Sequence, residues 1–246
     1  VRMPVIDRAS IYAPEDKIAI CRDLVIANAA SLTMINNSLL DIKRDWKNSG
    51  TFTPGQGTVT FNGEETNQVQ LINSGIKLNE TFYNLTLNSL DSAIGVNLPN
   101  NFQLTVANLL TLTSGILRLT DEAQLLQLGD LANPIEGSGK LLRDQQGKKS
   151  SFHYNYWSSP VSLDGVNYTI SGILRDGTDA VTNPYNPGLI SFGNAYDYAD
   201  GAISTPIKIS NRWIHKYTLS STNYNSWQRI GSTSNVKIGE GYTMKG

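Results

Sequence analysis

The hydrophobic residues of the first 145 positions recur in short alternating runs, in which one residue, usually polar, separates two apolar side chains. Because alternate residues of a β-strand point to the same face, this spacing predicts strands with one buried face. Gly, Asn and Ser, which favour turns, separate the runs. The predicted inward pairs are Leu24/Ile26, Leu32/Met34, Leu40/Ile42, Val59/Phe61, Val69/Leu71, Ile76/Leu78, Leu85/Leu87, Val96/Leu98, Leu104/Val106, Leu110/Leu112, Leu117/Leu119 and Leu126/Leu128.

These runs form four groups of three, whose leading strands begin near Leu24, Val59, Leu85 and Leu110. The later intervals match one turn of a three-sided parallel β-helix, roughly 20–30 residues. A bend at 114–115 lies between two strands in the same phase, as at a solenoid corner. We therefore expect residues 1–145 to form a parallel β-solenoid stalk. An antiparallel β-sandwich is the alternative, because it also produces short alternating strands with regular turns.

The composition changes near residue 150, and 14 of the 21 aromatic residues lie beyond that point. Strand-like aromatic runs follow at 152–157, 168–170, 213–217 and 227–230. We therefore place a domain boundary in the polar stretch 143–151 and predict an aromatic-rich, antiparallel β-sandwich-like domain over 146–246. A charged hairpin within a single domain is the alternative interpretation of that stretch.

The overall composition fits an all-β protein with many turns. Of 246 residues, 24 are Asn and 21 are Gly, and only 17% are charged. The net charge of −1 gives no basic surface for nucleic acid and little attraction to an anionic membrane. Cys21 is the single cysteine, so no internal disulfide forms, and we expect it to be a core or cap residue. The chain begins at Val1 and stops abruptly, which indicates a piece of a longer precursor.

Candidate catalytic groups are few. Only His153 and His215 titrate near neutral pH, and both lie in aromatic strand contexts that favour a packed or surface role. The sequence contains neither a Gly-x-Ser-x-Gly elbow nor a His-Glu-x-x-His zinc motif. Outward positions of the predicted solenoid are mostly Thr, Asn and Gln rather than acids or bases. The sequence therefore predicts a protein that is not an enzyme.

The aromatic residues of the second domain suggest a binding surface. Indole and phenol rings stack on the apolar faces of sugars and offer polar groups for hydroxyls. The candidates are Trp157, Trp213, Trp227, Tyr196, Tyr198 and Tyr224. Core packing is the alternative for Trp157 and Trp213, whereas the three tyrosines lie in polar stretches suited to exposed contacts.

Two acidic loops offer oxygen ligands for calcium. The candidate ligands are Asp176 and Asp179 in the first loop, and Asp197 and Asp200 in the second. Neither loop has the spacing of an EF-hand, and Asp-Gly is also ordinary turn chemistry. Calcium binding and a simple turn both remain open for these loops. We expect no other cofactor.

Several stretches resemble the cargo proteins of the type IX secretion system of Bacteroidetes, a group that includes gliding-motility adhesins. The matching stretches are 21–26, 30–34, 46–52, 57–63, 82–87, 110–115, 154–161 and 239–246. The resemblance implies export by the type IX secretion machinery of the outer membrane and display at the cell surface or outside the cell. The charged stretch 41–45 departs from the family pattern, and no sorting domain is visible.

Together these observations predict a non-catalytic stalk segment of a secreted or cell-surface adhesin. Its expected partners are the secretion machinery and either a surface polysaccharide or other adhesin segments, with no nucleic acid. A carbohydrate-binding accessory module of a secreted polysaccharide-degrading enzyme is the alternative.

Overall fold

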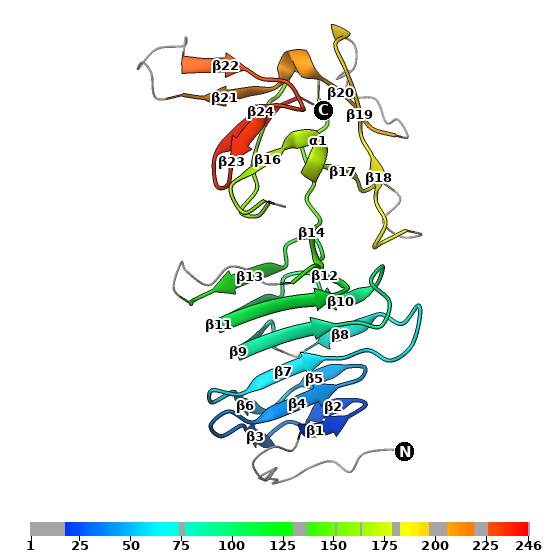
Figure 1. The fold of residues 1–246 in the computed structure, drawn as a ribbon, viewed down its shortest axis with the longest axis vertical. Helices are drawn as coiled ribbons and strands as arrows, with labels where there is room; N and C mark the ends of the chain where they lie inside the picture. Colours follow the sequence, from blue (N-terminus) through cyan, green and yellow to red (C-terminus); the bar gives the residue numbers. More distant parts are fainter. Residues whose placement is uncertain are drawn as a thin grey trace. The chain divides into compact units, whose positions relative to one another are not determined.

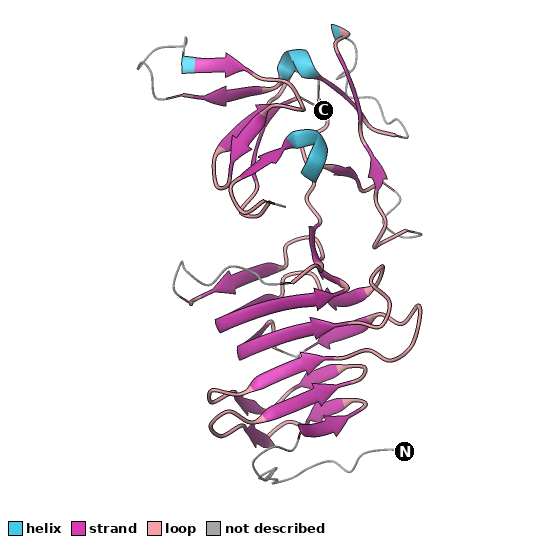
Figure 2. Cartoon of the chain, viewed as in Figure 1, coloured by secondary structure: helices cyan, strands magenta, loops and turns pink. Residues whose placement is uncertain are grey.

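The protein consists almost entirely of β-strands, with about 5% helix (Figure 2). A computed structural model describes residues 18–73, 77–129, 137–150, 152–162, 164–178, 183–196, 206–218 and 226–245. The chain divides into two compact units, Val1–Gln145 and Gln146–Gly246, and each is described by itself. Among the described residues, no helix has the length and apolar character needed to cross a membrane.

Unit 1 is a three-sided parallel β-solenoid of about five turns (Figure 1). One six-stranded sheet contains, in spatial order, β1 (Ile18–Cys21), β4 (Leu39–Ile42), β7 (Thr58–Phe61), β9 (Asn79–Asn88), β11 (Gln103–Ser114) and β13 (Gln124–Gln127). A second contains β14 (Lys140–Arg143), β12 (Ile116–Leu119), β10 (Gly95–Leu98), β8 (Gln70–Asn73), β5 (Trp46–Asn48) and β2 (Leu24–Ile26). On the third side, β3 (Ser31–Thr33) pairs with β6 (Thr51–Thr53).

Every strand pair in unit 1 for which a register is described is parallel. The long strands β9 and β11 each cover two sides, and a register shift between Val106 and Leu109 marks the corner. Side-chain hydrogen bonds also join adjacent turns, as between Asn62 and Asp41, 21 residues apart, and between Asn84 and Thr58, 26 residues apart. The predicted parallel solenoid is therefore confirmed.

The interior is built from columns of apolar side chains that stack turn upon turn. In-register pairing aligns Val59 with Leu85, and Leu85 with Leu110. The two columns of the first side are Ala19, Leu40, Val59, Leu85, Leu110 and Cys21, Ile42, Phe61, Leu87, Leu112. Almost all of these side chains are buried in one continuous core, so each turn covers the apolar face of the next.

Corners of the solenoid use residues that tolerate a left-handed backbone. Asn36, Asn67 and Asn101 have φ values of 48°, 63° and 60°. Gly115 has a φ of 91°, and a Cβ atom there would lie 2.7 Å from the carbonyl oxygen of Ile94. Only glycine fits this position without strain, which confirms the corner predicted at 114–115.

Three predicted strand pairs have the wrong inward residues. In β8 the buried side chains are Gln70 and Ile72, whereas Leu71 is exposed, so the Val69/Leu71 prediction was shifted by one position. Leu126 is exposed in β13, and Leu128 just beyond it is exposed as well. Leu78 is also exposed, and its predicted partner, Ile76, lies outside the described residues.

The first predicted group corresponds to β2, β3 and β4, which follow one another around the three sides. The alternation did not reveal β1 before this group, nor β5 and β6 after it. In β5 the inward residues are Trp46 and Asn48, both fully buried. The polar Asn48 breaks the two-apolar pattern, and therefore hid this strand.

A polar cluster lies inside the solenoid beside the aromatic part of its core. The buried Glu80 carboxylate accepts hydrogen bonds from Trp46 Nε1 at 2.8 Å and Asn48 Nδ2 at 2.7 Å. The Trp46 indole also packs against Phe52 and Phe82, with ring centroids 4.7 and 5.0 Å away. Since buried polar groups are costly without partners, these bonds fix how the second and third turns stack.

Unit 2 is built mainly from antiparallel sheets. Its largest sheet has the order β15 (Asn155–Ser158), β24 (Gly241–Met244), β21 (His215–Tyr217) and β22 (Trp227–Arg229). Two-stranded sheets pair β16 (Asn167–Thr169) with β23 (Asn235–Lys237), β17 (Arg175–Asp176) with β18 (Gly188–Leu189), and β19 (Ser191–Gly193) with β20 (Lys208–Ser210). Among the described strand pairs of unit 2, only β19 and β20 run parallel. The short helices α1 (Ile170–Ile173) and η2 (Asn211–Trp213) complete the described elements.

Substitution of one residue of an apolar column, compared with substitution of its outward neighbour, tests the solenoid core directly. Leu85 is fully buried, whereas the adjacent Thr86 points outward. We expect Leu85→Ala to lower the free energy of unfolding by about 2–5 kcal/mol, because it leaves a cavity in the column. Thr86→Ala should change it by less than about 1 kcal/mol. Urea unfolding followed by circular dichroism measures both, and equal losses would contradict an inward Leu85.

The reactivity of the Cys21 thiol tests whether the first turn is packed. Burial, with the negative charges of Asp23 and Asp41, raises the pKa of its thiol to about 11. The folded state therefore loses stability relative to the unfolded state as pH rises above the ordinary thiol pKa towards 11. At pH 8 we expect slow reaction of the native thiol with Ellman's reagent and fast reaction in urea. Equally fast reaction in both conditions would show that Cys21 is not packed.

Candidate functional site

The four-stranded sheet of unit 2 has one face packed on the core and one aromatic face. Trp157 pairs with Tyr242, and both belong to the core side, where Tyr242 and Met244 are buried. Tyr156 pairs with Thr243 on the opposite face. Tyr217 pairs with Trp227 across β21 and β22. Because successive side chains of a strand point to opposite faces of the sheet, Trp157 lies on the core face and Tyr156 on the aromatic face.

Three rings on the aromatic face lie against one another. The Trp227 ring centroid is 5.3 Å from that of Tyr217 and 6.4 Å from that of Tyr156. The ring planes meet at 64° and 65°, so the rings form walls rather than a flat stack. Tyr156 is 71% exposed, so most of its side chain is open to solvent.

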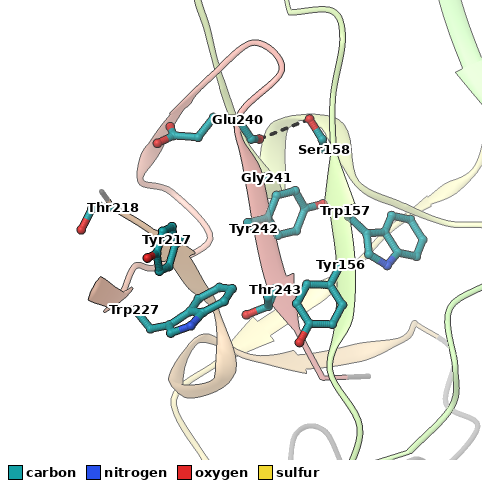
Figure 3. Close-up of a pocket in the computed structure, with 10 residues that line it drawn as sticks. All are labelled: Tyr156, Trp157, Ser158, Tyr217, Thr218, Trp227, Glu240, Gly241, Tyr242 and Thr243. Carbon is teal, nitrogen blue, oxygen red and sulfur yellow. Dashed lines mark hydrogen bonds between the residues drawn. The ribbon is translucent and has the colours of Figure 1, made fainter. Parts of the chain in front are cut away.

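These rings border an open cleft of about 860 Å³ (Figure 3). Its lining residues are Tyr156, Trp157, Ser158, Tyr217, Thr218, Trp227, Glu240, Gly241, Tyr242 and Thr243. In Figure 3 the Trp157 indole points away from Tyr156 and Trp227, in keeping with its packing against the core.

Small residues leave the space between the rings open. Ser158 pairs with Gly241, and Thr243 lies two residues further along β24. A Cβ atom at Gly241 would meet only the Trp157 carbonyl oxygen, at an ordinary contact distance of 3.6 Å. The backbone therefore does not require glycine here, and the missing side chain contributes directly to the hollow.

The polar groups of the cleft are largely hydroxyls. Ser158 Oγ donates to the backbone oxygen of Glu240 at 3.3 Å, and Thr243 Oγ1 donates to that of His215 at 3.5 Å. The Glu240 carboxylate lies 3.3 Å from Lys216 Nζ and accepts a bond from the Lys237 N–H. Burial opposes ionisation of Glu240, but these bonds and charges prevail and lower its pKa. Its negative charge is therefore balanced by Lys216.

Comparisons with protein-family models, curated proteins and solved structures found no match for this chain. Its function must therefore be inferred from its own residues and geometry. Of the six aromatic residues predicted to bind a ligand, Trp227 and Trp157 line the cleft, although the Trp157 indole faces the core. Tyr198 and Tyr224 lie outside the described residues.

Trp213 and Tyr196 form a separate aromatic cluster. Their ring centroids are 6.0 Å apart, and the Arg212 guanidinium lies 4.2 Å from the centre of the Tyr196 ring. Lys245 Nζ lies 4.1 Å from the centre of the Trp213 ring and 4.9 Å from that of Tyr154. Cations of the chain itself thus contact these rings. Neither Trp213 nor Tyr196 lines the cleft.

Two rings of the cleft were missed, because the sequence interpretation took its tyrosines from polar stretches rather than from the predicted strands. Tyr156 and Tyr217 both lie in the predicted strands, and alternation with Trp157 already placed Tyr156 on the opposite face. The pairing of β15 with β24, which brings Ser158 to Gly241, joins segments more than 80 positions apart and leaves no local signal.

The Asp176 carboxylate accepts hydrogen bonds from two segments that are far apart in the sequence. Its Oδ1 accepts bonds from the backbone N–H and the hydroxyl of Thr178, at 2.9 and 2.6 Å. Its Oδ2 accepts a bond from the Ile207 N–H at 2.9 Å. Both oxygens thus face hydrogen-bond donors rather than a space for a cation.

The other predicted calcium ligands, Asp179, Asp197 and Asp200, lie outside the described residues. Within the described ranges, no group of three or more His, Cys, Asp or Glu side chains is arranged to hold a metal. Calcium binding at these loops therefore stays a prediction.

The role of Asp176 can be measured through its pH dependence. Burial raises its pKa, but the accepted hydrogen bonds outweigh burial and lower it below the ordinary value. The stability it contributes is therefore present above the pKa of an unfolded aspartate and lost as pH falls through the lower, folded value. We expect Asp176→Asn to cost about 1–3 kcal/mol at pH 7, because an amide N–H₂ would face a donor.

Urea unfolding at pH 7 and at pH 3 measures this contribution, and the difference between wild type and variant should shrink at the lower pH. An effect of the substitution that disappears in the presence of EDTA would instead identify Asp176 as a metal ligand.

Proposed function

We propose that this chain is a non-catalytic segment of a cell-surface or secreted adhesin, in which unit 1 is a stiff stalk and unit 2 presents a recognition surface. The observation that carries the proposal is the uninterrupted stacking of apolar columns through successive turns of unit 1. In such a repeat, stability comes from each turn and its contacts with its neighbours, so length is gained without a larger core.

Polar contacts between turns support the role of a stiff element. The Arg44 guanidinium makes two 2.6 Å bonds to Asp23 one turn away, and Arg118 makes a similar pair with Asp144. Planar two-bond pairs of this kind are geometrically specific. The Arg44–Asp23 pair is partly exposed and adds little free energy, whereas the Arg118 side chain is buried. Together the two pairs resist sliding of one turn over the next.

The outer surface of the middle turns supports a structural rather than a catalytic role. Thr60, Thr86 and Thr111 occupy the same outward position in successive turns. Beside them, Asn88 bonds to Asn62, and Asn108 bonds to Asn84. Threonine hydroxyls and paired amides do not titrate near neutral pH, so this surface is suited to solvation and not to acid–base chemistry.

Export by the type IX secretion machinery is part of the proposal and rests on the resemblance of eight short stretches to its cargo proteins. The test is an epitope-tagged, full-length protein in its native bacterium. We expect antibody to label intact cells or the medium, and we expect this signal to be lost when the outer-membrane translocon is deleted. Retention in the cytoplasm, or export that survives the deletion, would contradict this part.

A second candidate function is an accessory module of a secreted polysaccharide-degrading enzyme. The aromatic cleft of unit 2 favours it, because exposed rings beside hydroxyls suit carbohydrate. The two candidates differ in the remainder of the full-length protein. Release of reducing ends from a bound polysaccharide by that protein would support the accessory module, and binding without release would support the adhesin.

A further inference from the structure

We propose that the cleft of unit 2 binds an uncharged glycan chain, with sugar rings stacked on Trp227 and Tyr156. The inference rests on the recognition role proposed above for this unit and names its ligand class. It follows from three features of the cleft: the orientation of its rings, the space at its floor, and the balance of its charges.

The rings provide the apolar part of the site. Tyr156, Tyr217 and Trp227 come from three strands and converge on one hollow (Figure 3). A pyranose ring has a C–H face that is apolar and an edge of hydroxyls. Stacking the C–H face on an exposed ring removes apolar surface from water and leaves the hydroxyl edge solvated.

The floor provides room and hydrogen-bonding groups. Gly241 has no side chain, and nothing in the backbone around it prevents one. Ser158 Oγ directs its hydrogen at a backbone oxygen, so its lone pairs remain able to accept bonds from sugar hydroxyls, whereas Thr243 is buried. The Trp227 indole N–H is a donor, and the Tyr156 phenol is both donor and acceptor.

The charges favour an uncharged glycan over an acidic one. Glu240 is the one ionisable carboxylate among the described lining residues, and Lys216 balances it at 3.3 Å. No Lys or Arg is among those lining residues. A uronic acid or sulfated sugar would therefore meet a carboxylate and no Lys or Arg among the lining residues, and would lose solvation on binding.

The experiment uses the full 246-residue chain and two sets of soluble polysaccharides. The uncharged set is a β-glucan, a xylan and a galactomannan, and the acidic set is alginate and polygalacturonate. Affinity electrophoresis ranks them, and titration calorimetry measures the dissociation constant for the best. We expect retardation by at least one uncharged polymer and none by the acidic polymers.

Two variants change the cleft in opposite ways. Trp227→Ala removes one aromatic ring from the cleft. Gly241→Leu fills the space between the rings and leaves all three rings in place. We expect each to weaken binding by about tenfold or more, the effect of losing one well-stacked aromatic contact or the space it borders.

Matched controls change the same residue types elsewhere in unit 2. Trp213→Ala removes an indole outside the cleft, and Gly188→Leu places a side chain where a Cβ meets only the Asp176 side chain, at 3.8 Å. Both should bind within about twofold of wild type. Thermal unfolding of each variant identifies losses caused by misfolding.

Three outcomes would overturn the inference: no uncharged polymer bound by the wild type, acidic polymers preferred, or folded cleft variants that bind as well as the controls. These outcomes leave the proposed adhesin role intact, since surface export is measured separately. Conversely, if the protein binds glycan but is never exported, the glycan site is supported and the adhesin role is contradicted.

Discussion

The structure of unit 1 depends on one constraint: no single turn of the solenoid can bury its own apolar side chains. A turn presents a thin ring of inward residues, and only the turns above and below cover them. In-register parallel pairing satisfies this requirement and the backbone hydrogen bonds together, because Val59, Leu85 and Leu110 stack while their strands bond. The stability of each turn is therefore tied to that of its neighbours.

The same constraint explains why the interior is not uniform. The turns differ in length, and the extra residues lie in corners such as 62–69. Large rings also pack in the interior, where the centroids of Trp46 and Phe82 lie 5.0 Å apart. Glu80 and Asn48 enter the interior at this place and bond to each other. Such a polar contact specifies one stacking arrangement, because any shift would leave a carboxylate buried without donors.

Alternation in the sequence predicted the architecture well, because a spacing of two and a recurring turn length are direct consequences of stacked strands. It failed at single strands for physical reasons. Gln70 faces inward and bonds to the backbone oxygens of Ile42 and Arg44, so a polar residue stands where an apolar one was expected. Leu126 faces outward on β13, a strand at the edge of its sheet. For the cleft, composition identified aromatic residues, but only strand pairing decides which rings converge.

The in-register stacking of successive turns holds unit 1 together, and it places Thr60, Thr86 and Thr111 in one outward column. In a Cys21→Ala background, paired cysteines at these positions test it through intramolecular disulfide formation. Neighbouring strands lie about 4.8 Å apart, and Cα atoms more than about 7 Å apart cannot be bridged. The account predicts that the pairs 60/86 and 86/111 oxidise readily and that 60/111 does not. Equal oxidation of all three pairs, or of 60/111 alone, would contradict it.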